Sequence, residues 1–353
     1  MFKRKTALAL GIVAALSLTA CASGGDAGGD DGGGDAAEGA SYTIKFGNVI
    51  SAGDTQNQAY EYFAELVNER SDGRITVEVY PDSQLGGERE MVEALQAGNL
   101  EMTAPSVGVL ANFDDSLQVF DFPFMFEDAQ TAYDILDGEI GDSLLGGIED
   151  TGVKVLGWGE NGFRNLAMTK ETALTPEDMK GQKLRVMQVP LHIAFWESIG
   201  AAPTPKAFPE VYTALQQGVV DGVENPFELM YSAKFTEVAS HATELRWIYD
   251  PEVLIIGKAF FDGLSAEDQE IVQSSATEAI ERLRELKAGI SDEIRGEIEA
   301  NGGTVADLTP EQRQQWIDAA VPFYEANASK VDTEKLKAIL EAAGNTTFLD
   351  AIS

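Results

Sequence analysis

The chain has 353 residues, 44% of them hydrophobic, and a formal net charge of −34 at pH 7. A negative charge of this size argues against binding to nucleic acid or to anionic lipid, because both need basic surface patches. The single cysteine, Cys21, excludes a disulfide within the chain and argues against a thiol-ligated metal site.

The chain begins with a predicted targeting segment. Basic residues at positions 3–5 precede an apolar stretch over 6–16 that is too short to cross a bilayer comfortably. The following "LTAC" resembles the bacterial lipobox, in which the signal is cut before the cysteine and the cysteine is lipidated. Residues 1–20 are therefore predicted to be a lipoprotein signal peptide and Cys21 the lipid anchor. A plain secretory signal with a chance cysteine is the alternative, which the alanine and leucine at the expected positions disfavour.

Residues 21–40 are predicted to be a flexible tether behind this anchor. Positions 22–40 contain eight glycines, five acidic residues and no large apolar side chain, so they cannot bury enough surface to fold. A Gly-rich coil of this length reaches about 24 Å. Removal of residues 1–20 changes the formal net charge from −34 to −37, a balance that would suit a salty milieu.

The remaining 41–353 exceed a typical single core and predict two lobes. The pattern starts as strand, helix, strand, helix, strand, with strands over 42–49 and 74–81 and the third beginning near 101. This order predicts a mostly parallel sheet, on which ligands bind outside the carboxyl ends of the strands.

The middle and the end of the chain continue this α/β pattern. The phenylalanine-rich segment 119–130 is interpreted as a buried connection, and 153–160 as a strand. Thr175 with Asp178 is typical of a capping box before a short helix. Further helices are expected over 191–199 and 209–218. Residues 265–300 form one helical pattern with Gly289 and Gly296 as its only weak points, which predicts a helix about 54 Å long that could link two lobes.

Three short motifs place hydrogen-bonding side chains in or after strands: "ENGFRNL" with Arg164, "KLRVM" with Arg185, and "DGVENP" with Asn225. The segment 183–187 alternates, so that Arg185 lies on the face opposite Leu184. The arginine could belong to a solvated strand face. It could also bind an anion, because its planar fork gives a carboxylate two parallel charge-assisted bonds.

With these motifs, the chain resembles the substrate-binding proteins of tripartite ATP-independent periplasmic (TRAP) transporters, solute-binding family 7. "YPDSQLGGERE", "VFDFPFMFED", "TPEDMKGQKLRVM" and "GAAPTPKAFPEVYTALQQGVVDGVENP" carry the resemblance, which covers essentially all of 41–350. It implies a two-lobed α/β, periplasmic-binding-protein-like fold with crossing strands and a long helix spanning both lobes. Lobe I would comprise 41–161 and about 250–290, and lobe II 162–249 and about 291–353.

The resemblance also implies a binding site for a small organic acid. Arg185 matches the main carboxylate-binding arginine, Arg164 an assisting arginine and Asn225 their partner. The remaining substrate-binding residues would be an aromatic contact and three residues at the distal end of the ligand: Phe208, Asn161, Glu88 and Ser106. The motifs are closest to those of hexuronate and related sugar-acid binders, whereas a C4-dicarboxylate or a keto acid stays an alternative.

Simpler structural interpretations of these residues stay open at this point. Arg164 could pair with Glu160, Asn225 could be only a turn residue before Pro226, and Glu224 could be a solvated neighbour. The two histidines, His192 and His241, are interpreted as surface or packing residues.

The function expected from the sequence is binding without chemistry. The chain lacks the motifs of serine hydrolases, zinc proteases and nucleotide-binding folds, so no catalytic residue, cofactor or metal is predicted. The partners would be a small carboxylate ligand, the membrane subunits of a TRAP permease, and the extracytoplasmic face of the cell membrane through the lipid anchor. The chain is expected to be a monomer. A ligand sensor for a membrane kinase is the competing function.

Overall fold

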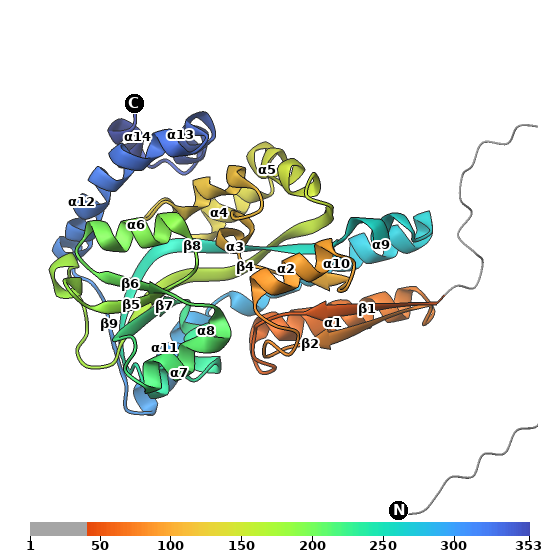
Figure 1. Ribbon diagram of the computed structural model, residues 1–353, viewed down its shortest axis with the longest axis horizontal. Helices are drawn as coiled ribbons and strands as arrows, with labels where there is room; N and C mark the ends of the chain where they lie inside the picture. The colour runs from red at the N-terminus through yellow and green to blue at the C-terminus, as the bar shows by residue number, and fades with distance from the viewer. Residues whose placement is uncertain (1–40) are drawn as a thin grey trace, which may run out of the picture. The chain divides into compact units, whose positions relative to one another are not determined.

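The computed structural model describes residues 41–353. The predicted signal peptide, Cys21 and the tether lie outside the described residues. Figure 1 shows the arrangement of the helices and strands.

The described chain begins with the predicted alternation of strands and helices. Strand β1 (Tyr42–Gly47) is followed by helix α1 (Thr55–Arg70), β2 (Ile75–Tyr80), α2 (Glu88–Gln96) and the short β3 (Met102–Thr103). β1 pairs in parallel with both β2 and β3, which confirms the predicted parallel arrangement. The strands form here because apolar residues alternate along β1 and β2 and face the core.

Two long antiparallel strands cross the middle of the sheet. β4 (Val153–Met168) pairs with β8 (His241–Gly257) along most of its length. The predicted strand over 153–160 was therefore too short, because β4 continues to Met168. Irregularities in register follow Val155, Glu160 and Arg164, and Gly157 and Gly162 adopt positive φ angles. These two glycines allow β4 to bend and continue.

A second set of parallel strands lies beyond β4. β5 (Lys183–Val186) pairs with β6 (Ala202–Pro205) and β7 (Gly222–Asn225), and all these strands belong to one sheet of order β2-β1-β3-β8-β4-β7-β5-β6. β9 (Thr304–Ala306) pairs with β8. The two sets of parallel strands are thus separated by the crossing pair β8 and β4.

The helices of the second half largely match the expectations. α6 (Pro190–Ser198) follows β5, and α7 (Val211–Gln216) and α8 (Phe227–Ser232) flank β7. The predicted capping box before the short helix η2 is confirmed, since the backbone N–H of Thr175 donates to Asp178 Oδ2 at 2.8 Å. The other helices are α3 (Val107–Leu110), η1 (Asp115–Asp121), α4 (Ala129–Leu136), α5 (Glu139–Glu149), η2 (Pro176–Met179), η3 (Phe208–Glu210), η4 (Phe235–Glu237), α9 (Lys258–Asp262), α12 (Pro310–Asn327), η5 (Ala328–Lys330), α13 (Thr333–Ala342) and α14 (Thr346–Ala351).

The long helical pattern near the end of the chain is divided in the structure. α10 (Ala266–Lys287) and α11 (Ile290–Ala300) are separate helices, so the prediction of one continuous helix over 265–300 was wrong. The break lies at Gly289, whose φ of 82° is left-handed and incompatible with a continuing α-helix. α10 packs against α1 and β4, whereas α11 packs against α8 and β9.

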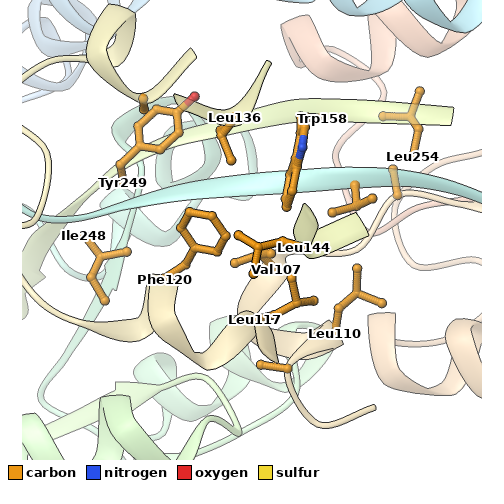
Figure 2. Close-up of a cluster of buried hydrophobic side chains, with 14 of the residues drawn as sticks. Val107, Leu110, Leu117, Phe120, Leu136, Leu144, Trp158, Ile248, Tyr249 and Leu254 are labelled. Atoms are coloured by element: carbon orange, nitrogen blue, oxygen red, sulfur yellow. The ribbon is translucent and has the colours of Figure 1, made fainter. Parts of the chain in front are cut away.

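The hydrophobic core consists of a large cluster and a smaller one. The large cluster fills the space around β4 and β8, and Figure 2 shows part of it, with Phe120 and Trp158 packed edge to face. The predicted burial of the phenylalanine-rich segment is confirmed, because Phe120, Phe122 and Phe124 all belong to this cluster. The smaller cluster surrounds α7, α8 and α11.

The predicted lobe boundaries fall inside the crossing strands, at 161/162 in β4 and 249/250 in β8. They stay predictions, because the backbone contacts of the described residues form one unit. Within 41–353, no helix combines the length and the apolar character of a membrane span.

Candidate functional site

Arg185 is a buried cation with no carboxylate beside it among residues 41–353. It lies in β5 and is 3% exposed. Its Nε and Nη2 donate to the carbonyl of Lys206 at 3.2 and 2.8 Å, and its Nη1 donates to Asn225 Oδ1 at 3.1 Å. No carboxylate oxygen within 41–353 comes within 4.0 Å of the guanidinium. Burial accordingly lowers the pKa of Arg185 to about 10.

A cavity of about 470 Å³ opens in front of this arginine. Residues of both halves of the chain line it, and three of them belong to the predicted binding set: Glu88, Arg185 and Phe208. Asn225 joins this group through its hydrogen bond to Arg185, at the carboxyl end of β7. Because β5 and β7 are parallel neighbours, the two side chains meet at one edge of the sheet.

Arg164 lies in β4 and is occupied by internal partners. Its Nε donates to Glu224 Oε2 at 2.6 Å, its Nη2 to Glu224 Oε1 at 2.9 Å and to the Glu224 carbonyl at 2.7 Å, and its Nη1 to Asp250 Oδ2 at 2.7 Å. Burial alone disfavours the charged form, but the two carboxylates more than offset this and raise the pKa of Arg164. Arg164 is therefore neither a surface charge nor a partner of Glu160.

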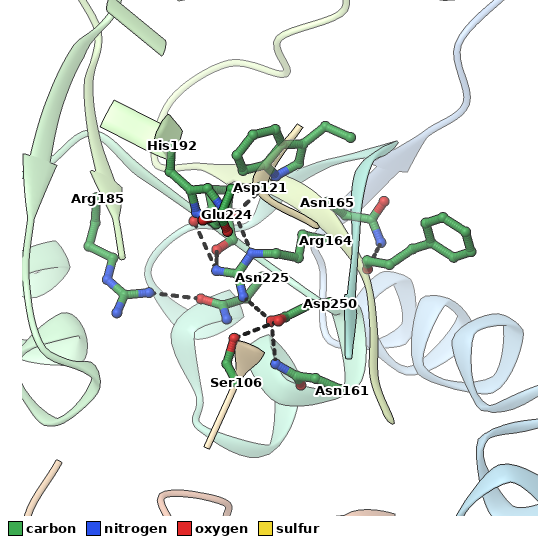
Figure 3. A network of polar contacts seen from close by, with 12 residues as sticks. Ser106, Asp121, Asn161, Arg164, Asn165, Arg185, His192, Glu224, Asn225 and Asp250 are labelled. Carbon is green, nitrogen blue, oxygen red and sulfur yellow. Dashed lines mark hydrogen bonds and ion pairs between the residues drawn. The ribbon is translucent and has the colours of Figure 1, made fainter. Parts of the chain in front are cut away.

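Glu224 is the main anionic partner of Arg164, and its interpretation as a solvated neighbour was wrong. The residue is fully buried in β7. Its Oε2 also accepts a hydrogen bond from Trp247 Nε1 at 2.9 Å. The neighbouring Asn225 points to Arg185 instead, because successive residues of a strand face opposite sides. Figure 3 shows that the two arginines belong to separate sets of contacts.

Asp250 connects three of the predicted site residues. Its Oδ2 accepts from Arg164 Nη1 and from Asn161 Nδ2 at 2.8 Å, and its Oδ1 accepts from Ser106 Oγ at 2.5 Å (Figure 3). Asp250 and the buried Glu252 were not predicted from the sequence; Glu252 accepts a hydrogen bond from Tyr60 Oη at 2.6 Å. A signal was present, since both acids interrupt the apolar strand "RWIYDPEVLII".

Glu88 brings an acidic group to the cavity. It is the first residue of α2, and its Oε1 accepts the backbone N–H of Ser106 at 2.8 Å. Burial raises the pKa of Glu88 to about 7, although the hydrogen bond from Ser106 opposes the shift. Glu88 thus changes its charge near neutral pH, on the wall that also contains Arg185.

Asn161 is placed differently from Glu88. It lines a second cavity of about 290 Å³, together with Lys287 and Gly289 near the break between α10 and α11. Its Oδ1 is buried and has no hydrogen-bond partner within the described chain. Ser106 is buried and reaches the first cavity only through its backbone bond to Glu88. The predicted distal group is therefore spread over two cavities, and its role in binding stays a prediction.

The chemistry available in the first cavity is that of anion recognition. A buried guanidinium with free N–H groups meets a hydrogen-bonding asparagine, and an aromatic ring and an ionisable carboxyl complete the wall. Within 41–353, no group of three or more histidine, cysteine or acidic side chains is arranged to hold a metal ion.

Comparison with known proteins places these features in a family. The model of "Bacterial extracellular solute-binding protein, family 7" matches residues 46–330. The 2,3-diketo-L-gulonate-binding periplasmic protein of Escherichia coli is 36% identical over 281 residues, which cover 79% of this chain and 85% of the relative.

Two solved structures share the fold. The sugar acid binding protein of Advenella mimigardefordensis, in complex with galactonate, has a TM-score of 0.85 at 29% identity, covering 86% of this chain and 98% of that one. A TRAP periplasmic solute binding protein of Sulfurospirillum deleyianum with bound succinate has a TM-score of 0.82 at 33% identity, covering 85% and 98%.

Proposed function

The chain belongs to family 7 of the bacterial extracellular solute-binding proteins, the TRAP binding proteins for small organic acids, and we propose that its own ligand is a sugar acid such as a hexuronate. In this proposal the chain captures the acid between its two lobes and delivers it to the membrane subunits of a TRAP permease. It performs no reaction on the ligand.

One observation carries the proposal: Arg185 is a buried guanidinium that faces a cavity and has no carboxylate partner within 41–353. A buried charge is costly unless it is paired, and a ligand carboxylate would supply the missing partner. Arg164, by contrast, is already compensated by Glu224 and Asp250.

The acidic groups of the cavity favour a hydroxylated monoacid. Glu88 and Glu210 line the same cavity as Arg185. Ionised carboxylates accept hydrogen bonds from sugar hydroxyls and repel a second carboxylate. Galactonate and 2,3-diketo-L-gulonate, named for two of the similar proteins, are acids of this kind. Succinate, bound by the similar protein of Sulfurospirillum deleyianum, is a dicarboxylate instead. A C4-dicarboxylate or keto acid is therefore the alternative.

A thermal-shift screen tests the proposal. The protein is heated with D-galacturonate, D-glucuronate, D-galactonate, succinate and pyruvate in separate samples. A ligand present at about 1,000 times its Kd adds roughly 4 kcal/mol to the free energy of unfolding, which raises the melting temperature visibly. If only succinate or pyruvate stabilises the protein, the ligand is a C4-dicarboxylate or a keto acid and the sugar-acid proposal is wrong. Uptake of the labelled acid by cells with and without the chain distinguishes transport from sensing for a membrane kinase.

The charge of Glu88 is expected to make acid selectivity depend on pH. Its raised pKa of about 7 means that the carboxyl is neutral below this pH and negative above it. Raising the pH from about 6 to about 8.5 should therefore weaken succinate binding relative to D-galacturonate by about tenfold. In Glu88→Gln, calorimetric titration should show a ratio of affinities that no longer changes with pH. The same pH dependence in the variant would assign the effect to another group.

We also propose that Cys21 anchors the chain to the extracytoplasmic face of the membrane. Cys21→Ser should release the protein into the soluble fraction, because the lipid would have no attachment site. The released protein should bind the screened acid as the parent does. Fractionation of cells followed by immunoblotting measures the release, and a variant that stays in the membrane fraction contradicts the anchor.

A further inference from the structure

A buried polar junction joins the start of α1 to α8. We call it the α1–α8 junction; it consists of Asp54, Thr55, Glu228, Ser232 and Lys287. The backbone N–H and the hydroxyl of Thr55 donate to Glu228 Oε1 and Oε2 at 2.9 and 2.8 Å. Ser232 Oγ donates to Asp54 Oδ2 at 2.9 Å, and Lys287 Nζ donates to Glu228 Oε2 at 2.6 Å.

The junction bridges the two sets of parallel strands. α1 packs on β2 and on α10, which ends at Lys287, whereas α8 follows β7 and packs on α11. Glu228 and Lys287 are nearly buried, with side chains 6% exposed. In terms of the predicted lobes, Asp54, Thr55 and Lys287 belong to lobe I, and Glu228 and Ser232 to lobe II. All four of these hydrogen bonds join the two predicted lobes, so they must break when the lobes separate.

Glu228 caps a helix that belongs to the other lobe. The first N–H groups of a helix have no acceptor within the helix. The N–H of Gln56 donates to Asp54 Oδ1 at 3.0 Å. The N–H of Thr55 donates to Glu228 Oε1 instead. The positive end of the α1 dipole also favours this carboxylate.

Lys287 has an alternative partner within its own lobe. Its Nζ lies 2.6 Å from Glu228 and 3.9 Å from Asp54 Oδ1, and it also donates to Gln56 Oε1 at 3.3 Å. The ammonium can therefore stay paired with Asp54 when Glu228 withdraws. Separation of the lobes exposes the junction to water without leaving a cation buried and unpaired. The junction thus has two chemically acceptable states, as a switching contact requires.

We propose that Glu228 is a latch that stabilises the closed arrangement of the two lobes and so sets ligand affinity without touching the ligand. The inference rests on the proposed function, because closure matters only if a ligand is enclosed. Glu228 does not line the cavity of Arg185; it lines the second cavity, with Asn161 and Lys287. When only the closed form holds the ligand, the apparent Kd equals the intrinsic Kd divided by the closed fraction.

The first arm of the test measures closure in the absence of any ligand. A Cβ placed on Gly87 would lie 3.9 Å from Ala207 Cβ, and both residues line the cavity of Arg185. This is within the range of about 3.5–4.5 Å that a disulfide needs. In a Cys21→Ser background, Gly87→Cys and Ala207→Cys should therefore cross-link under copper phenanthroline at a rate that reports the closed population. Adding Glu228→Gln should slow cross-linking about tenfold.

The second arm measures affinity in the protein without the introduced cysteines. Calorimetric titration with D-galacturonate should give an apparent Kd about tenfold higher for Glu228→Gln than for the parent. Glu237→Gln is the matched control, because Glu237 is an exposed acid near α8 and should leave both readouts unchanged. Ser232→Ala removes one neutral contact and should give a smaller shift in the same direction.

An unchanged cross-linking rate in Glu228→Gln overturns the latch, even if affinity falls, because the residue would then act on the ligand or on folding. Slower cross-linking supports the latch even if D-galacturonate does not bind the parent, a result that would count against the proposed function alone. A melting temperature equal to that of the parent excludes partial unfolding as the cause of slower cross-linking.

Discussion

Arg185→Ala is expected to weaken binding of the sugar acid by about 30- to 4,000-fold, which corresponds to about 2–5 kcal/mol. In the parent, the ligand carboxylate would be buried against the guanidinium. In the variant, the same carboxylate would be buried without its main partner. Calorimetric titration with the acid that the screen selects measures the loss.

The fold should survive this substitution, because Arg185 has no ion pair to lose in the part of the chain that the structure describes. Its direct partners are the Lys206 carbonyl and Asn225. Removing a buried cation that lacks a carboxylate should leave the melting temperature without ligand unchanged or raise it. Arg185→Lys keeps the charge but loses the planar fork, and should also bind substantially more weakly than the parent.

Arg89→Ala provides the matched control for the charge of the cavity. Arg89 lines the same cavity, but its side chain is 55% exposed and is paired with Glu93. Its loss should change affinity by no more than a few-fold. If Arg185→Ala binds within a few-fold of the parent, the carboxylate site lies elsewhere. If Arg185→Ala unfolds the protein, the residue is structural.

Arg164→Met should produce the largest loss of stability, about 3–5 kcal/mol in the free energy of unfolding. Methionine leaves the carboxylates of Glu224 and Asp250 buried without their shared cation. Urea unfolding followed by tryptophan fluorescence measures the loss. Because Arg164 joins β4 to β7 and β8 at the site, ligand affinity should fall as well, through displacement of Glu224 and its neighbour Asn225.

Two further variants separate charge compensation from packing. Adding Glu224→Gln and Asp250→Asn to Arg164→Met removes the uncompensated charges and should restore part of the lost stability. Arg282→Met is the exposed control, and it should change stability by less than about 0.5 kcal/mol, because the only ion pair of Arg282 within 41–353 is with the exposed Glu285. A loss below about 1 kcal/mol for Arg164→Met would show that the buried network does not stabilise the fold.

The sequence by itself determined the local structure and the class of the protein. The alternation around Arg185 predicted β5, and the spacing of Thr175 and Asp178 predicted the capping box, because both patterns depend on neighbours within a few residues. The order of strands and helices predicted the parallel start of the sheet, and the motifs along the chain predicted the family that the comparisons support.

The predicted ends of one strand and one helix were wrong, and both errors lie near a glycine, a residue that adopts positive as well as negative φ angles. Gly162 and Gly289 both lie in otherwise regular patterns and both have positive φ. β4 continues through Gly162 because the strand pairs with β8 on either side of this residue. At Gly289, by contrast, the helical pattern breaks between α10 and α11. A helix or strand pattern cannot tell these outcomes apart, because the pairing partner lies about 90 residues away in the first case.

The resemblance assigned the main carboxylate-binding role to Arg185, but only the tertiary structure decided which arginine has carboxylate partners within the described chain. Both arginines occupy strand motifs of similar appearance, and both are buried. Arg164 is compensated by Glu224 and Asp250, which are 60 and 86 residues away in the chain. Arg185 donates instead to the neutral side chain of Asn225 and to the Lys206 carbonyl. Charge compensation acts through space and is strongest where water is excluded, so it depends on the folded neighbours of a residue rather than on its neighbours in sequence.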